Sequence, residues 1–121
     1  MQQNTIELAT GICQEYPSGT PPLTAEAAAS YMPALPGWSL EEGKRVHKAF
    51  RFDNFANALA FVNRIGAVAD EQDHHPDLQL GWGRVVVDLT THSVGGLSTN
   101  DVFLAARIEL LTPDAPGLKT S

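Results

Sequence analysis

Two strand patterns, each followed by a helical pattern, constrain the fold of this chain more than any other feature. In Val46–Phe52, apolar and polar side chains alternate, which is typical of a strand with one buried face. The run Val85–Thr91 is rich in β-branched residues, which favour strands. A glycine-containing turn precedes each run, so both are expected to form hairpins. The expected partner strands are Trp38–Leu40 and Leu78–Trp82.

Three segments carry the spacing and the end signals of helices. The longest places apolar residues three or four apart over Phe55–Ala69, after Asp53 as the expected N-cap. Ser98 and Asp101 form a capping-box pattern at the start of the last helix. The first helix is a short, Ala-rich stretch, Ala25–Met32. The resulting order, α-β-β-α-β-β-α, predicts an α+β fold: a four-stranded antiparallel sheet with three helices packed on one face.

The length of 121 residues fits one domain, and the composition narrows its class. Weak patterning at both ends predicts a flexible N-terminal arm over 1–22, a folded domain over 23–111 and a disordered tail over 112–121. The net charge of −6 argues against non-specific binding to nucleic acid or to an anionic membrane. The single cysteine, Cys13, and the lack of a signal-peptide pattern or a long apolar run favour a cytoplasmic protein.

Three of the four histidines lie between residues 70 and 101 and are the main candidates for chemistry. His74 and His75 precede Pro76, which holds the residue before it extended. His92 follows the last strand, and the intervening hairpin would bring it near the pair. Imidazole titrates at about pH 6.5, so neutral and protonated rings can act as base and acid in one cleft. The alternative is that the pair is ordinary polar loop and that Asp101 only closes the capping box.

Other chemistries have weaker support. Adjacent histidines rarely ligate one metal ion, and no Cys-x-x-Cys, His-x-His or His-x-x-x-His spacing occurs. Cys13 lies in the arm, and no serine-centred elbow or phosphate-binding glycine loop is present. His47 is expected to lie on a strand surface. We therefore expect no metal.

The spacing of these residues resembles that of a known family. Asp70 is followed at fixed intervals by His74-His75-Pro76, Trp82, His92 and Asp101, and this pattern resembles the signature of the pterin-4a-carbinolamine dehydratases. The segments Pro36-Gly37-Trp38, Phe50-x-Phe52-x-x-Phe55 and Gly96-Leu97-Ser98-x-x-Asp101 agree with it. The resemblance extends over residues 23–111 and leaves both ends unexplained.

The resemblance implies a reaction and roles for the residues. Members of the family remove water from 4a-hydroxytetrahydropterin to give quinonoid dihydropterin, which recycles the pterin of aromatic amino-acid hydroxylases. His74 and His92 would form the acid–base pair, and His75 would bind and orient the pterin. Asp101 would hold a histidine or the pterin edge. The residues implied in substrate binding are Trp38, Trp82 and Asp70. No cofactor is implied, because the pterin is the substrate.

The resemblance also implies partners. Members form homodimers or homotetramers, so we expect self-association through sheet edges or helices, and a hydroxylase is a further possible partner. Some similar proteins act instead as protein-binding modules. One kind is a dimerisation cofactor of a homeodomain transcription factor, and another helps assemble RuBisCO in carboxysome-bearing bacteria. The sequence leaves this alternative open.

Overall fold

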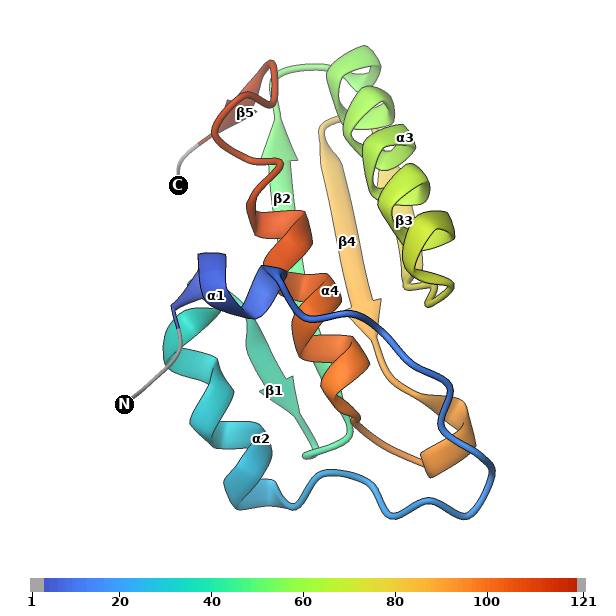
Figure 1. Ribbon diagram of the computed structural model, residues 1–121. Coiled ribbons are helices and arrows are strands. Elements are labelled where there is room, and N and C mark those ends of the chain that lie inside the picture. Colours follow the sequence, from blue (N-terminus) through green and yellow to red (C-terminus); the bar gives the residue numbers. More distant parts are fainter. Residues whose placement is uncertain (1–3, 120–121) are drawn as a thin grey trace.

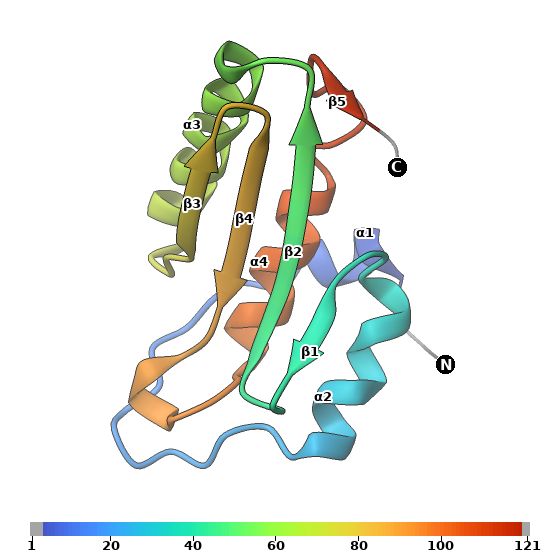
Figure 2. The same cartoon turned by 180° about the vertical axis from the view of Figure 1, so that it is seen from behind.

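An antiparallel sheet forms one layer of the molecule, and helices cover one of its faces (Figures 1 and 2). The computed structural model describes residues 4–119. The strands are β1 Ser39–Glu41, β2 Arg45–Phe52, β3 Asp77–Gly81, β4 Arg84–Leu89 and β5 Leu118–Lys119. Four of them lie in the order β1-β2-β4-β3, and β5 pairs with the end of β2. The edges of the sheet therefore belong to β3 on one side and to β1 and β5 on the other.

The helical elements lie between and beside these strands. They are α1 Thr5–Ala9, α2 Ala25–Tyr31, η1 Met32–Ala34, α3 Phe55–Gln72, η2 His92–Val94 and α4 Thr99–Glu109. α3 and α4 lie on the same face of the sheet, α1 crosses α4, and the opposite sheet face is open (Figures 1 and 2). The predicted α+β class is confirmed, with α1 and β5 as additional elements. Over residues 4–119, no helix is long and apolar enough to cross a membrane.

The register between β2 and β4 builds the core. Val46 pairs with Leu89 and Phe50 pairs with Val85, so alternate side chains of both strands point toward the helices, as the pattern predicts. Phe61 of α3 packs on Phe50 with 5.0 Å between ring centroids. All five side chains are at most 3% exposed. Burying each contributes about 1.5–3 kcal/mol, which fixes the helix layer on the sheet.

The two long helices begin at side-chain caps. The capping box of Ser98 and Asp101 starts α4 as predicted. α3 is capped by Asn54 rather than by Asp53, because the Asn54 side chain accepts the backbone N–H of Asn57 at 2.8 Å. Asp53 instead accepts the side-chain amide of Asn57. Aspartate and asparagine cap about equally well, so the sequence alone did not separate these neighbours.

Both ends of the chain contain packed elements that the sequence pattern did not predict. α1 begins with a capping box at Asn4 and buries Leu8, which is 1% exposed. At the other end, Leu118 in β5 pairs with Phe52. The expected flexible arm and disordered tail thus each pack against the domain. Elements of five and two residues are too short to show a period. Residues 1–3 and 120–121 of these segments lie outside the described residues.

Candidate active site

A short hydrogen bond joins the first predicted histidine to the predicted aspartate. His74 Nε2 lies 2.6 Å from Asp101 Oδ1, across 27 residues of sequence. The Asp101 side chain is fully buried, and the His74 side chain is 12% exposed. Hydrogen bonds to a carboxylate are strong and directional, and more so away from water. The contact therefore fixes the position of the His74 ring.

The end of α3 directs His74 toward α4. Asp73 takes the left-handed conformation, with φ of 52°, which aspartate adopts more readily than most residues. The backbone N–H of His74 then donates to the carbonyl of Ala69 at 3.2 Å, which closes the last turn of the helix. This turn brings the His74 imidazole to the first turn of α4, where Asp101 lies.

Asp101 also holds the segment that carries His92. Its Oδ2 accepts the hydroxyl of Thr91 at 2.7 Å. The N–H and the carbonyl of Thr91 pair with Gly96 and close the loop around η2. His92 is the first residue of η2, and it is exposed. One buried carboxylate thus binds His74 directly and reaches His92 through the neighbouring threonine. No sequence pattern pointed to Thr91, because a threonine at a strand end is common.

His75 lies beside His74 and faces solvent. Its Nε2 is 2.8 Å from Asp70 Oδ1, and the two side chains are 57% and 81% exposed. Such an exposed pair adds little stability, but it orients the ring and leaves Nδ1 free. The structure therefore brings Asp70, His75, His74 and Asp101 together between the end of α3 and the start of α4.

Trp38 lies in the core, away from this group. Its ring is 7% exposed and packs edge-on against Phe50. The indole N–H donates to Glu109 at 2.8 Å, and the ammonium of Lys48 binds the same carboxylate oxygen. The indole is thus occupied by structural contacts and has little ring surface to offer a planar ligand.

Trp82 lies in the turn between β3 and β4 and is 69% exposed. The histidine pair precedes β3, whereas Trp82 follows it. The length of β3, roughly 13 Å at about 3.3 Å per residue, separates the two within one chain. The structure therefore does not bring Trp82 to the histidines of its own chain.

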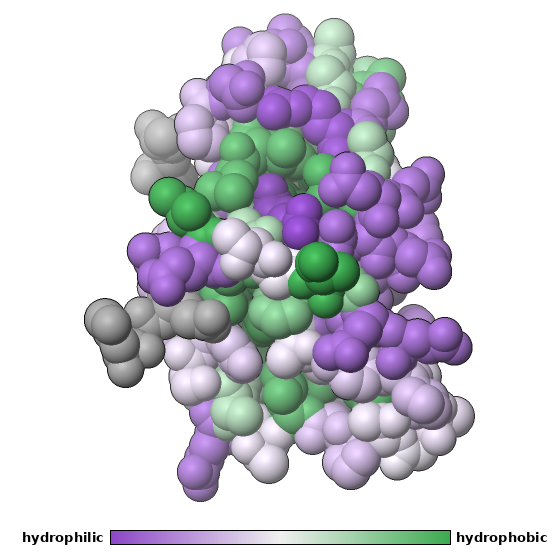
Figure 3. Space-filling model, in the orientation of Figure 1, coloured by the Kyte–Doolittle hydropathy of each residue, from purple (hydrophilic) through white to green (hydrophobic). Residues whose placement is uncertain are grey.

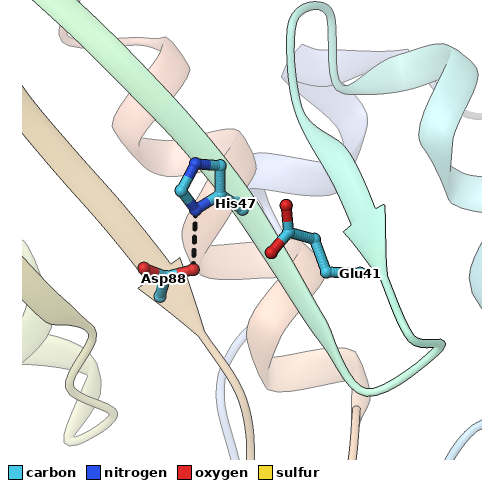
Figure 4. A group of neighbouring side chains, drawn as sticks. All are labelled: Glu41, His47 and Asp88. Atoms are coloured by element: carbon cyan, nitrogen blue, oxygen red, sulfur yellow. Dashed lines mark hydrogen bonds and ion pairs between the residues drawn. The ribbon is translucent and has the colours of Figure 1, made fainter.

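A second group of polar side chains lies on the open face of the sheet (Figure 4). The ligand atoms of Glu41, His47 and Asp88 lie within 4.8 Å of one another, as a metal site requires. His47 Nδ1 is 2.8 Å from Asp88 Oδ1. Arg45 lies 3.1 Å from Glu41 and 3.7 Å from Asp88. The pKa of Arg45 is raised, first by its hydrogen bond to Glu41. The carboxylate of Glu41 is thus already paired with a positive charge, which also lies near Asp88 and opposes the binding of a cation between them.

The fold and the first group of side chains define a small α+β protein that pairs two histidines with carboxylates, an arrangement suited to acid–base chemistry. The family model described as "Pterin 4 alpha carbinolamine dehydratase" matches residues 21–111. The chain belongs to this family, and the resemblance stated from its motifs is confirmed.

Proteins from several bacteria are similar over most of their length. The chain is 42% identical over 105 residues to a protein of Rubrobacter xylanophilus, with 87% of this chain and 98% of that one covered. It is 43% identical over 106 residues to a protein of Microcystis aeruginosa, with 85% and 91% covered. Both are named "Putative pterin-4-alpha-carbinolamine dehydratase".

Solved structures share the fold. A crystal structure of a transcriptional coactivator/pterin dehydratase from Brucella melitensis matches with a TM-score of 0.70 and 30% identity. The match covers 74% of this chain and 97% of that one. A pterin dehydratase-like RuBisCO assembly factor of the alpha-carboxysome matches with a TM-score of 0.53 and 23% identity, over 62% and 88% of the two chains. The second likeness shows the fold alone.

Proposed function

We propose that this protein removes water from a 4a-hydroxytetrahydropterin to give quinonoid dihydropterin. The observation that carries the proposal is the bond between His74 and the buried Asp101, in a chain of this family. In the reaction the C4a–O bond breaks, the hydroxyl leaves as water, and N5 loses its proton as the C4a–N5 double bond forms. The step needs one proton donor and one proton acceptor.

His74 and His92 supply these two groups in the proposal. The carboxylate of Asp101 accepts a hydrogen bond from the Nε2–H of His74, so Nδ1 is the ring nitrogen left for the substrate. His92 directly follows Thr91, whose hydroxyl donates to the other oxygen of Asp101. His75, oriented by Asp70, binds the pterin edge. Each positioned proton transfer is worth typically about 10²–10⁴ in rate.

The test generates the 4a-hydroxy intermediate with an aromatic amino-acid hydroxylase and follows its absorbance decay with and without this protein. We expect clear acceleration by the wild type. His74→Ala and His92→Ala should each lose about 10²-fold or more of it, while circular dichroism shows an intact fold. His47→Ala, on the open sheet face, is the matched control and should keep full activity. Full turnover in either of the first two variants would contradict the role assignment.

The second candidate function is a protein-binding role. The neighbour at 30% identity is described as both a transcriptional coactivator and a pterin dehydratase, and the present sheet has one face without helices (Figure 2). The second neighbour is described as a RuBisCO assembly factor, and such a role belongs to the same class. No acceleration of pterin decay, together with stable co-purification of one large partner, would favour this candidate over the enzyme.

We further propose a cytoplasmic location, a part in recycling a tetrahydrobiopterin-type pterin, and assembly into a homodimer or homotetramer. The reaction itself is neutral in protons and electrons, so the proposed chemistry calls for no cofactor beyond the substrate.

A further inference from the structure

A strap of residues 10–22 joins α1 to α2 and precedes most of the domain that the family model matches. It crosses α4 and runs on toward η2 (Figure 1). The N–H of Cys13 donates to the side chain of Gln72, at the end of α3, at 3.0 Å. The N–H of Gly19 donates to the carbonyl of Ser93, in η2, at 3.3 Å. The strap thus bridges the two segments that carry His74 and His92.

The centre of the strap is held by the residue before Asp101. The side-chain carbonyl of Asn100 accepts the N–H of Gln14 at 2.9 Å, and its side-chain NH₂ donates to the Gln14 carbonyl at 2.7 Å. The hydroxyls of Tyr16 and Thr99 lie 2.7 Å apart. Asn100 is 5% exposed. The strap is therefore attached at the first turn of α4, directly beside the buried carboxylate of the candidate site.

Hydrogen bonds, rather than buried side chains, hold the strap in place. None of residues 10–22 is buried, and Ile12 is 73% exposed. The surface on this side mixes hydrophilic and hydrophobic residues (Figure 3). Each hydrogen bond adds only about 0.5–1.5 kcal/mol net. Segments with exposed hydrogen bonds and few apolar contacts open at low free-energy cost, whereas the flanking anchors, such as Leu8, are buried.

The strap runs beside the two least exposed side chains of the site. The His74 side chain is only 12% exposed, and Asp101 is fully buried. The Cys13 Sγ lies 3.6 Å from the carbonyl of Asn100. Burial raises the pKa of the Cys13 thiol to about 11, with a smaller effect from the Asp101 charge. The thiol thus lies against the residue that precedes Asp101, and the His74 ring beside it offers little exposed surface to a planar ligand.

We propose that the strap is a gate over the histidine site, that it opens to admit and release the pterin, and that Asn100 is the positioning residue that holds it closed. The inference deepens the proposed function and rests on it for the identity of the ligand. It concerns a segment whose sequence pattern predicted only a loose arm.

The two hydrogen bonds between Asn100 and the backbone of Gln14 form the latch of the strap. A pair of variants at Gln14 tests this latch without changing α4. Gln14→Pro removes the N–H that Asn100 accepts, whereas Gln14→Ala removes only the side chain and is the matched control. Hydrogen–deuterium exchange at the amides of Cys13 and Gly19 should be at least about five-fold faster in Gln14→Pro and in Asn100→Ala than in the wild type. Gln14→Ala should exchange like the wild type. Equal exchange in the two Gln14 variants would overturn the latch.

The gate is tested by ligand kinetics with 7,8-dihydrobiopterin as the probe, in stopped-flow fluorescence. Because opening limits entry and exit, association and dissociation should both be at least about three-fold faster in Gln14→Pro and in Asn100→Ala than in Gln14→Ala. A substitution that only distorts the binding site would alter the affinity for the probe, but it would not make both association and dissociation faster. Wild-type protein that binds no pterin would overturn the proposed function. Wild-type protein that binds it, with equal rates in the two Gln14 variants, would overturn the gate alone.

Discussion

At the scale of single residues, Asp101 combines structural and chemical contacts in one carboxylate. It closes the capping box of α4 through the N–H of Ser98 and accepts the hydroxyl of Thr91. The same side chain holds His74. The sequence offered the capping role and the catalytic role as alternatives, and the geometry shows that one carboxylate has room for both sets of contacts. Its two oxygens point to different partners.

A substitution at Asp101 therefore affects stability and activity together. In Asp101→Asn one oxygen becomes an NH₂ group that cannot accept a hydrogen bond, so one of the three donors loses its acceptor. We expect a loss of about 1–3 kcal/mol in the free energy of unfolding and a fall in dehydration rate of about ten-fold or more. Urea unfolding measures the free energy of unfolding, and the absorbance decay of the 4a-hydroxy intermediate measures the dehydration rate. Ser98→Ala, the control, should lose about 1 kcal/mol and keep most activity. Equal activity in both variants would show that Asp101 is only a cap.

The Cys13 thiol offers a prediction about pH. Its pKa rises from 9.0 to about 11, mainly because the thiol is partly buried. Only the thiolate reacts with iodoacetamide, so at pH 8 the folded protein should react about 100-fold more slowly than a thiol of ordinary pKa. The rate should rise about ten-fold per pH unit and level off near pH 11. The same protein unfolded in urea is the control. A rate that levels off near pH 9 in the folded protein would contradict the burial.

At the scale of elements, short segments at the two ends complete the packing of the long ones. α1 and β5 lie on the helix layer and on the end of β2, respectively. Their apolar residues are few, but Leu8 is among the most buried side chains of the described chain. α1 therefore belongs to the folded unit and anchors one end of the strap.

Removing the side chain of Leu8 tests this role of α1. Leu8→Ala should cost about 2–5 kcal/mol, because a fully buried leucine leaves a cavity. Ile6→Ala, in the same helix at 66% exposure, should change stability by less than about 0.5 kcal/mol. Thermal and urea unfolding of both variants give the comparison. If the two variants unfold alike, α1 is not packed on α4 in solution.

At the scale of the whole molecule, the sequence predicted the helices and strands whose apolar residues recur with a regular period, and it missed the features that have no such period. The alternation in Val46–Phe52 and the spacing in Phe55–Ala69 each extend over two or more repeats, so four strands and three helices could be expected. Contacts between distant residues have no such signal. The resemblance implied that Asp101 holds a histidine or the pterin edge, but the choice of His74, the bond to Thr91 and the burial of Trp38 depend on how the sheet and the helices pack.

Self-association is the last property that belongs to the whole molecule. Among residues 4–119 no strand pairs with the outer edge of β3, and Leu80 in β3 and Trp82 in the turn after it are 37% and 69% exposed. A free edge with apolar side chains tends to pair with another strand. We therefore expect a homodimer through β3, and Leu80→Lys should shift it to monomers. Sedimentation equilibrium or light scattering measures the mass.

A helix face is the competing interface, and Leu59 on α3 provides the matched control. It is 39% exposed, close to the exposure of Leu80. If β3 is the interface, Leu59→Lys keeps the dimer while Leu80→Lys dissociates it, because a lysine at the seam must be desolvated. The reverse result would assign the interface to α3. A monomeric wild type at micromolar concentration would contradict both, and Leu80 would then be an ordinary exposed residue.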